Sequence, residues 1–416
     1  MKRNDSPASR HILEAVITSL LPGVHVDPYD RTARNPVNFF LDHVRDHLGL
    51  DFDFYLVNAS SPEQFTLTQF NPPCVVYDVA HTALMAAGLP VPMEQELEQR
   101  FWRNLFLRLV SDFLVPLHRP ELAFLALDLA ARDGLQLAYE HKLMDLEMAD
   151  YDEMYIASWF FGLAHELGHL VQQKQGLVIV NDYGFVSVEA IAEIGNELIR
   201  RTADLPPQWV TDSSGKATVL NATSVGLSVE DAETLLPEVL ADISAIEMLW
   251  GFCEPFARSV GRDPNWSYLS RSILMSFPML RFIASAKFVA AFIASPANLD
   301  IRAARAREGM GVRFCVIANV LARLSGSEEY PDPNVLEFGF AIDQHHSQRM
   351  YPGVAEAQIL GWNLAQSGND VGEVVNEILK MRASEDAVEN LFWYVQMTRL
   401  KTMCSRHGLD FAERLP

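Results

Sequence analysis

The chain has 416 residues, 49% of them hydrophobic and 21% charged, which is the composition of a globular protein with a substantial core. Its formal net charge of −21 argues against non-specific binding of nucleic acids, because such binding needs clustered Lys and Arg to displace counterions. The four cysteines lie far apart and form no CxxC pair, so neither a cysteine zinc site nor a disulfide framework is indicated. The first ten residues lead into no long apolar run, and together these features favour a cytoplasmic location.

The first ninety residues combine helical and extended patterns. Apolar residues at helical spacing predict helices over 12–21 and 37–48. Aromatic and β-branched residues predict a strand over 52–58. The apolar run 74–79 fits either a strand at the edge of a cleft or the start of a helix.

Long helices dominate from Glu94 onward. Apolar residues at four-residue spacing share one helical face there: Phe101, Leu105, Leu109 and Phe113. Further helices are expected over 122–146, 155–173, 188–200, 228–251, 273–294 and 301–324, and after Pro352 and Ser384. The sequence therefore predicts a mainly α (α+β) fold with a small β element, divided into an N-terminal α/β region 1–93, a helical core 94–325 and a C-terminal helical region 326–416.

The apolar stretch 273–295 has the length of a membrane span. It carries Pro278, Arg281 and Lys287 in its interior. Placing a charge near the centre of a bilayer costs roughly 3 kcal/mol or more. We therefore expect a buried helix of a soluble protein and no membrane span.

The segment with the clearest chemical meaning holds His165, Glu166 and His169 in an H-E-x-x-H arrangement. Residues four apart on a helix lie one turn apart on the same face, so both imidazoles can bind one Zn²⁺ ion at about 2.0–2.1 Å. Glu166 projects beside them, where it can take a proton from a water molecule that the metal activates. The sequence therefore predicts one zinc ion per chain, with Glu166 as general base.

The residues around this motif are apolar on nearly every side of the helix, which predicts that the helix is buried. Two histidines and a glutamate without partners would be costly there. The alternative is that the three residues are exposed or hydrogen-bonded in the core, and that the motif is accidental.

A catalytic zinc site needs a third protein ligand, and no His follows closely behind His169. Glu238 and Asp242 lie four residues apart on a later apolar helix, where buried acids need partners. We predict that Glu238 is the third ligand and that Asp242 orients a ligating histidine through its other ring nitrogen. Glu193, on the helix predicted over 188–200, is the chief competitor for the ligand role.

Together, HELGH and the later PEVLAD segment resemble the gluzincin metallopeptidases, such as thermolysin and the prenyl-protease group. The match covers about a dozen residues in two segments. The resemblance implies a zincin-like fold with additional helices, in which the first acid of the second motif binds zinc and the next acid orients a histidine. It also implies that 94–325 is the catalytic core and that 326–416 contributes to the active-site cleft.

A third segment places His345, His346 and Arg349 in a loop-like region before Pro352. It resembles the His-containing segment, followed by Arg, that prenyl-protease-type gluzincins place over the site. The Pro and the longer gap of that family pattern are missing here. A donor in this place would stabilise the oxyanion of hydrolysis. We therefore predict His345 as that donor with Arg349 in support, while a surface His pair stays an equal alternative and the choice of His345 or His346 stays open.

These features predict a zinc-dependent endopeptidase that is intracellular, has a narrow protein or peptide target, binds no nucleic acid and has no membrane span. Peptide substrate is expected to lie extended along a strand edge. Two alternatives remain: a catalytically inactive, peptidase-derived metal-binding scaffold, and a helical interaction protein.

Overall fold

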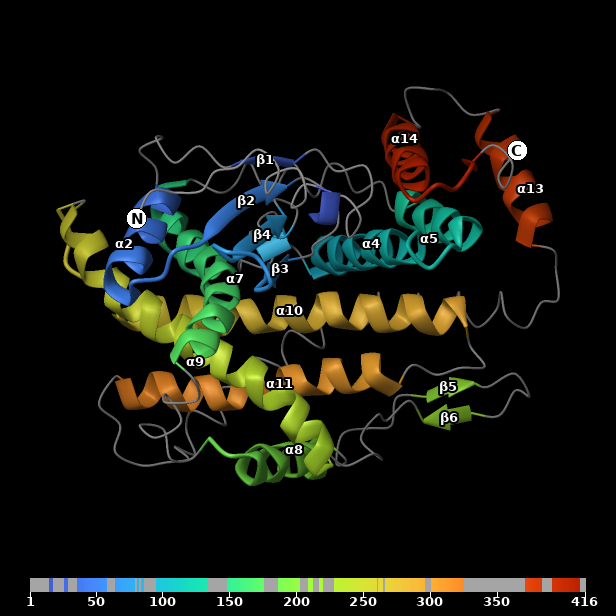
Figure 1. Ribbon diagram of the computed structural model, residues 1–416. Coiled ribbons are helices and arrows are strands. Elements are labelled where there is room, and N and C mark those ends of the chain that lie inside the picture. Colours follow the sequence, from blue (N-terminus) through green and yellow to red (C-terminus); the bar gives the residue numbers. More distant parts are fainter. Residues whose placement is uncertain are drawn as a thin grey trace.

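The computed structural model describes residues 15–17, 26–28, 36–57, 64–78, 81, 84–85, 95–132, 148–175, 186–202, 209–211, 217–219, 228–259, 261–264, 266–295, 301–324, 371–383 and 391–411. These residues form mostly helices with a small sheet, which confirms the predicted mainly α class (Figure 1). The strands are β1 Val26–Pro28, β2 Asp53–Val57, β3 Gln64–Leu67, β4 Cys74–Asp78, β5 Trp209–Thr211 and β6 Ala217–Val219. The helices are α2 Pro36–Leu48, α4 Gln95–Leu114, α5 Pro120–Arg132, α7 Met148–Gln175, α8 Val188–Thr202, α9 Val229–Ser259, α10 Trp266–Ala294, α11 Ile301–Leu324, α13 Val371–Ala383 and α14 Leu391–Arg406.

Four strands near the N-terminus form one sheet in the order β1-β2-β4-β3. β2 and β4 are parallel, whereas β1 and β3 are antiparallel edge strands. The run 74–79, for which the sequence left two readings open, is the central strand β4, and all five of its side chains are buried. Because alternate side chains point to opposite faces, Val75 and Tyr77 pack toward α7 while Cys74 and Val76 pack on the other side.

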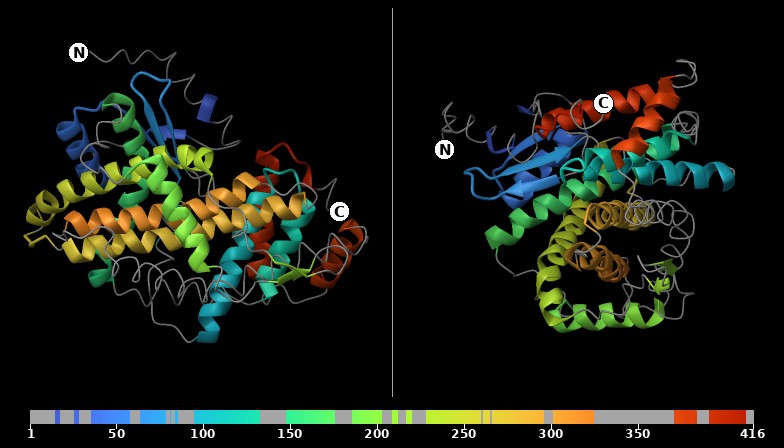
Figure 2. Two further views of the ribbon diagram at one scale, coloured as in Figure 1. Left: turned by 90° about the horizontal axis from the view of Figure 1, so that it is seen from below. Right: turned by 90° about the vertical axis from the view of Figure 1, so that its right-hand side faces the viewer.

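The helix α10 runs through the molecule as a long rod (Figure 1). The sheet, α4 and α5 lie on one side of it, and α11 and α8 lie on the other (Figures 1 and 2). Its buried apolar residues up to Phe277 belong to a core shared with α7, α9 and α11, and those from Met279 onward belong to a second core shared with α4, α5 and α14, while the partly buried Leu280 packs against both. The change from one core to the other falls at Pro278.

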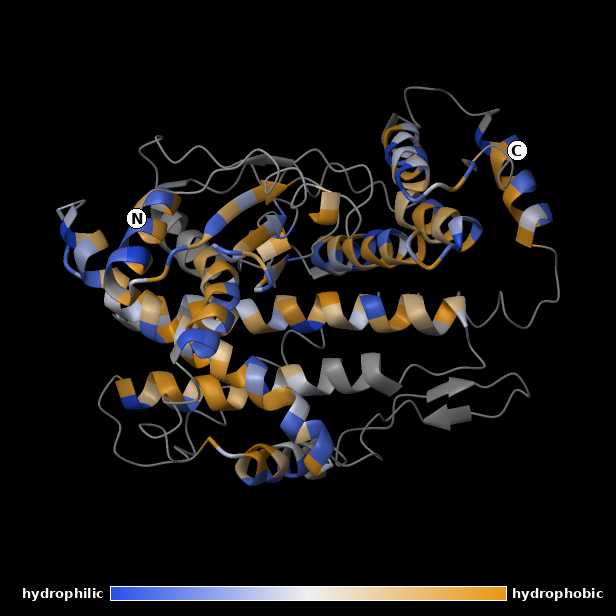
Figure 3. Cartoon of the chain, viewed as in Figure 1, coloured by the Kyte–Doolittle hydropathy of each residue, from blue (hydrophilic) through white to orange (hydrophobic). Residues whose placement is uncertain are grey.

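The ribbon of α10 is mostly hydrophobic (Figure 3). Within the part of the chain that the structure describes, its segment Ser272–Ala291 is the one helix long and apolar enough to cross a membrane, and 61% of that segment is buried inside the fold. A buried core helix passes the same test of length and composition, so this finding is weak evidence for a span. The expectation of a soluble chain stays a prediction.

The remaining expectations about secondary structure have mixed outcomes. Helices α2, α7, α8, α9 and α11 include the ranges predicted for them, apart from a residue or two at some ends. The helix predicted over 122–146 ends at Arg132, and residues 133–147 lie outside the described part. The short strand β3 was not predicted. α14 shares a core with α4 and α5, across the expected boundary at 326, and the three predicted regions stay untested.

Candidate metal centre

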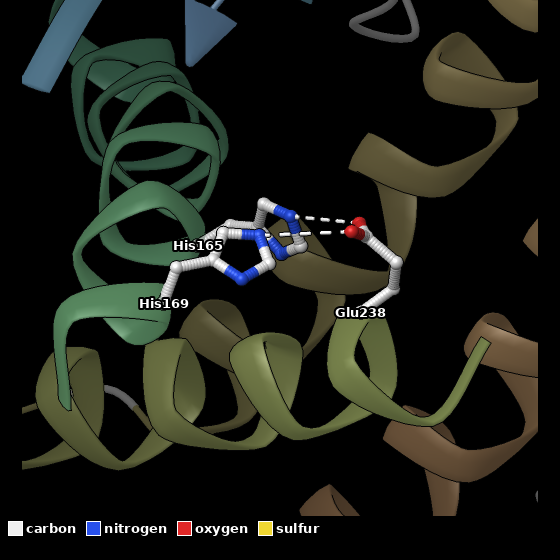
Figure 4. Close-up of side chains that lie close together, drawn as sticks. All are labelled: His165, His169 and Glu238. Atoms are coloured by element: carbon white, nitrogen blue, oxygen red, sulfur yellow. Dashed lines mark ion pairs between the residues drawn. The ribbon is translucent and has the colours of Figure 1, made fainter. Parts of the chain in front are cut away.

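The two histidines of α7 face a carboxylate of α9 (Figure 4). His165 Nε2 lies 3.3 Å from Glu238 Oε2, and His169 Nε2 lies 3.7 Å from Glu238 Oε1. The three ligand atoms that these residues offer all lie within 4.8 Å of one another, so they can hold one metal ion. The structure thus brings together the three residues that the sequence analysis selected as ligands.

The donor set fits zinc in kind and in spacing. Zinc prefers imidazole nitrogens and carboxylate oxygens in a tetrahedral arrangement, and catalytic sites use three protein ligands with one open position. Bonds of about 2.0–2.1 Å at tetrahedral angles put neighbouring ligand atoms about 3.3–3.4 Å apart. The 3.3 Å and 3.7 Å separations, which run to the two oxygens of the Glu238 carboxylate, are near that value, and one ligand atom from each residue lies within 4.8 Å of the others.

The fold leaves these ligands partly open to solvent. Every side chain from Phe160 to Val171 is buried except His169, which is 26% exposed, while Glu238 is 41% exposed. An ion between them would therefore have protein beneath it and an accessible side for water and substrate.

Asp242 fixes the tautomer of His165. The Asp242 side chain is fully buried, and its Oδ1 lies 2.8 Å from His165 Nδ1. Burial alone would raise the pKa of Asp242, but the charge of Arg313 and its hydrogen bonds hold that pKa below the usual range. Because an ionised carboxylate can only accept, His165 Nδ1 carries a proton and donates it, which leaves Nε2, on the side of Glu238, as the nitrogen that a metal ion would take.

Arg313 of α11 completes the buried network, and its role was not predicted from the sequence. Its Nε donates to Asp242 Oδ2 at 2.6 Å and its Nη2 donates to Asp242 Oδ1 at 2.7 Å. Its Nη1 lies 3.6 Å from Glu238 Oε2, so one guanidinium contacts both acids of α9. The available signal was that Arg313 is the only charged residue in the apolar run 312–322.

The electrostatics of the site favour positive charge between the ligands. Burial lowers the pKa of the His165 ring, and so does repulsion by Arg313. The charge of Asp242 and the hydrogen bonds to Asp242 and Glu238 are stronger, and they raise the pKa of His165 to about 9. Burial would likewise raise the pKa of Glu238, but its hydrogen bond to His165 and the nearby cationic groups lower it to about 2. A metal cation at the same point would satisfy the same carboxylate.

Glu166 faces the sheet side of α7, one residue after the first histidine. Its side chain is buried, and burial raises its pKa against the attraction of His165. The hydroxyl Oγ1 of Thr66 in β3 lies 2.9 Å from Glu166 Oε2 and 3.0 Å from the Glu166 backbone oxygen. A carboxyl group with a raised pKa beside a metal site has the properties of a general base. The contact with Thr66 was not predicted, because β3 was not.

A glycine of α7 lets polar groups of the sheet approach the same helix one turn earlier. A Cβ on Gly162 would lie 3.1 Å from Gln64 Oε1, 3.1 Å from His81 Nε2 and 3.4 Å from the Tyr77 hydroxyl. His81 is 2% exposed and packs edge-on against Tyr77. The sheet, together with His81 just after β4, therefore presents polar side chains along α7 from Gly162 to Glu166.

The other candidate residues do not join this cluster. Glu193 is exposed on α8 and belongs to no group of potential metal ligands among the described residues. His345, His346 and Arg349 lie outside the described residues, so their predicted roles stay predictions.

Comparison of the chain with protein-family models, with curated proteins and with solved structures finds no match.

Proposed function

We propose that this chain is a zinc-dependent endopeptidase with a gluzincin-type site in a zincin-like fold. The observation that carries the proposal is the convergence of His165, His169 and Glu238, whose ligand atoms lie within 4.8 Å of one another, with Glu166 next to the two histidines on α7. A site with a purely structural ion has no use for a buried carboxyl group at that position.

The residues divide the chemistry of peptide hydrolysis among them. His165, His169 and Glu238 would hold zinc, which supplies Lewis acidity for a water molecule and for the carbonyl oxygen under attack. Glu166 takes the proton of the attacking water and passes it to the leaving amine. Asp242 and Arg313 keep the ring of His165 in the ligating orientation. His345 remains the proposed donor to the oxyanion, with Arg349 in support.

The edge strand β3 supports a peptide or protein as substrate. It pairs with β4 on one side, and no described strand pairs with its other side. An extended peptide can add to such an edge through backbone hydrogen bonds. Since Thr66 of β3 contacts Glu166, a peptide on this edge would lie beside the general base.

The test compares the wild-type chain with Glu166→Gln after zinc loading. Zinc content measured by atomic emission should be near one ion per chain in both proteins. A proteome-wide cleavage screen should then give cut sites with the wild type that Glu166→Gln does not produce. Glu233→Gln, at an exposed position of α9, is the matched control and should cut like the wild type.

The same experiment separates the alternatives. A chain that binds zinc but yields identical cleavage with wild type and Glu166→Gln is a metal-binding scaffold without turnover. A folded chain that takes up no zinc in either form would make the motif accidental and leave an interaction protein.

A further inference from the structure

Thr66 is the residue of the sheet that hydrogen-bonds to the candidate general base. Its Oγ1 lies 2.9 Å from Glu166 Oε2 and 3.0 Å from the Glu166 backbone oxygen. The other carboxylate oxygen of Glu166, Oε1, bonds to none of the described residues. Among the described residues, one oxygen of the carboxylate is therefore held from the sheet and the other has no hydrogen-bond partner.

The register of β3 fixes the direction of this hydroxyl. Thr66 is paired with Val75 of β4, and Val75 packs toward α7. The flanking residues Phe65 and Leu67 pack on the opposite face of the sheet. A slip of one residue would replace the hydroxyl with an apolar side chain, so pairing with β4 places the donor at Glu166.

A hydroxyl group suits both protonation forms of a carboxyl group. It carries one hydrogen and two lone pairs. It can donate to Oε2 of the carboxylate, or it can donate to the backbone oxygen while accepting from the carboxylic acid. Valine, which has nearly the same shape, can do neither.

We propose that Thr66 is a positioning residue that holds Oε2 of Glu166, so that Oε1 receives the proton of the attacking water. The proposal rests on the proposed peptidase function. The proton passes from water to Oε1 and then to the leaving amine nitrogen, while Thr66 keeps its own proton throughout. Because Thr66 belongs to the strand on which a peptide would add, the same strand aligns the base and the substrate.

The test uses Thr66→Val, Thr66→Ser and the control Thr68→Val in the full chain. Thr68 is exposed just beyond β3, so its replacement repeats the chemical change away from Glu166. Crystal structures of the zinc-loaded variants should show the Glu166 carboxylate displaced in Thr66→Val and in place in the other two. With a cleaved peptide from the screen, Thr66→Val should lower kcat about ten- to a hundredfold with KM and zinc content unchanged. Thr66→Ser should restore most of kcat.

An undisplaced Glu166 carboxylate in Thr66→Val would overturn the positioning role, whether or not the chain has activity. So would a loss that appears in KM or in zinc content alone, or a failure of serine to restore kcat. Failure of the peptidase proposal looks different. The wild type and Glu166→Gln would then give the same cleavage products, although the displaced carboxylate in Thr66→Val could still be seen.

Discussion

Gly168 of α7 lies directly against the backbone of Ala241 in α9. A Cβ placed on Gly168 would be 2.5 Å from the Ala241 carbonyl oxygen and 2.9 Å from its Cα. No side chain fits there, because backbone atoms cannot swing aside as the end of a flexible side chain can. Gly168 precedes His169, and Ala241 lies between Glu238 and Asp242. The close approach of the two helices therefore sets the distance between the histidines and the acids.

Gly168→Ala should push α7 and α9 apart. We expect a loss of about 1–3 kcal/mol in the free energy of unfolding, as for other overpacked cores, together with weaker zinc binding. Gly251→Ala is the control, because a Cβ there meets only the His43 ring at 3.8 Å. It should stabilise the chain by about 0.5–1 kcal/mol through helix propensity. Urea unfolding in the presence of a chelator measures the free energy of unfolding of both variants. A Gly168→Ala variant that unfolds with the same free energy as the wild type would contradict the tight packing.

Glu238→Ala should remove a ligand of the proposed zinc ion. Replacing a residue that only orients a ligand lowers metal affinity by roughly ten- to hundredfold, and we expect that loss for Asp242→Asn. The loss of zinc affinity in Glu238→Ala should be well above it. Glu193→Ala, which removes an exposed acid, should leave the affinity unchanged. Competition with a fluorescent chelator gives all three constants. Equal losses for Glu193→Ala and Glu238→Ala would show that Glu238 has no special role.

Arg313→Met should destabilise the chain strongly. It leaves the fully buried carboxylate of Asp242 without its cationic partner, and breaking a buried pair costs about 3–5 kcal/mol. Arg258→Met is the control, because Arg258 and Glu254 form an exposed pair worth about 0.5 kcal/mol or less. Chemical denaturation of both variants without metal measures the difference. Equal effects would show that the Asp242–Arg313 pair contributes no more than a surface pair.

The stabilisation from Asp242 should depend on pH in a defined direction. Its pKa is below the ordinary carboxyl value of about 3.9, so the folded chain holds the ionised form more firmly than the unfolded chain does. The difference in unfolding free energy between wild type and Asp242→Asn should shrink as the pH falls below about 5 and through the lowered pKa of Asp242. It should also shrink as the pH rises from about 6.5 toward 9, because Asp242 raises the pKa of His165 to about 9 and that contribution is lost when the ring loses its proton. Urea titrations of metal-free protein at a series of pH values measure it. A difference that already shrinks between pH 7 and pH 5 would contradict a lowered pKa.

The sequence predicted the part of the site that lies within single helices. Four-residue spacing places His165 and His169 on one face of α7, and this local geometry holds for any α-helix. Glu238 and Asp242 were selected because acids on an apolar helix need partners, and the structure supplies His165 and Arg313 as partners. The class of fold followed for the same reason, since long apolar periodicities are strong signals.

The contributions from other elements were not predicted. Thr66 belongs to a strand of only four residues, whose alternation of polar and apolar side chains is too short to stand out. Arg313 lies on a helix with several other arginines, and only the packing of α11 against α9 shows which of them meets Asp242. Both roles depend on contacts between segments far apart in the chain, which periodicity does not encode.

The groups around His165 come from β3, α7, α9 and α11, which meet only in the finished fold. An unfolded chain keeps no more than the two imidazoles near each other, so it would capture zinc poorly. An ion that prefers the folded form adds to stability by mass action, by about 4.1 kcal/mol when free metal is a thousandfold above the dissociation constant. Metal supply in the cell would then govern the lifetime of this chain as well as its proposed catalysis.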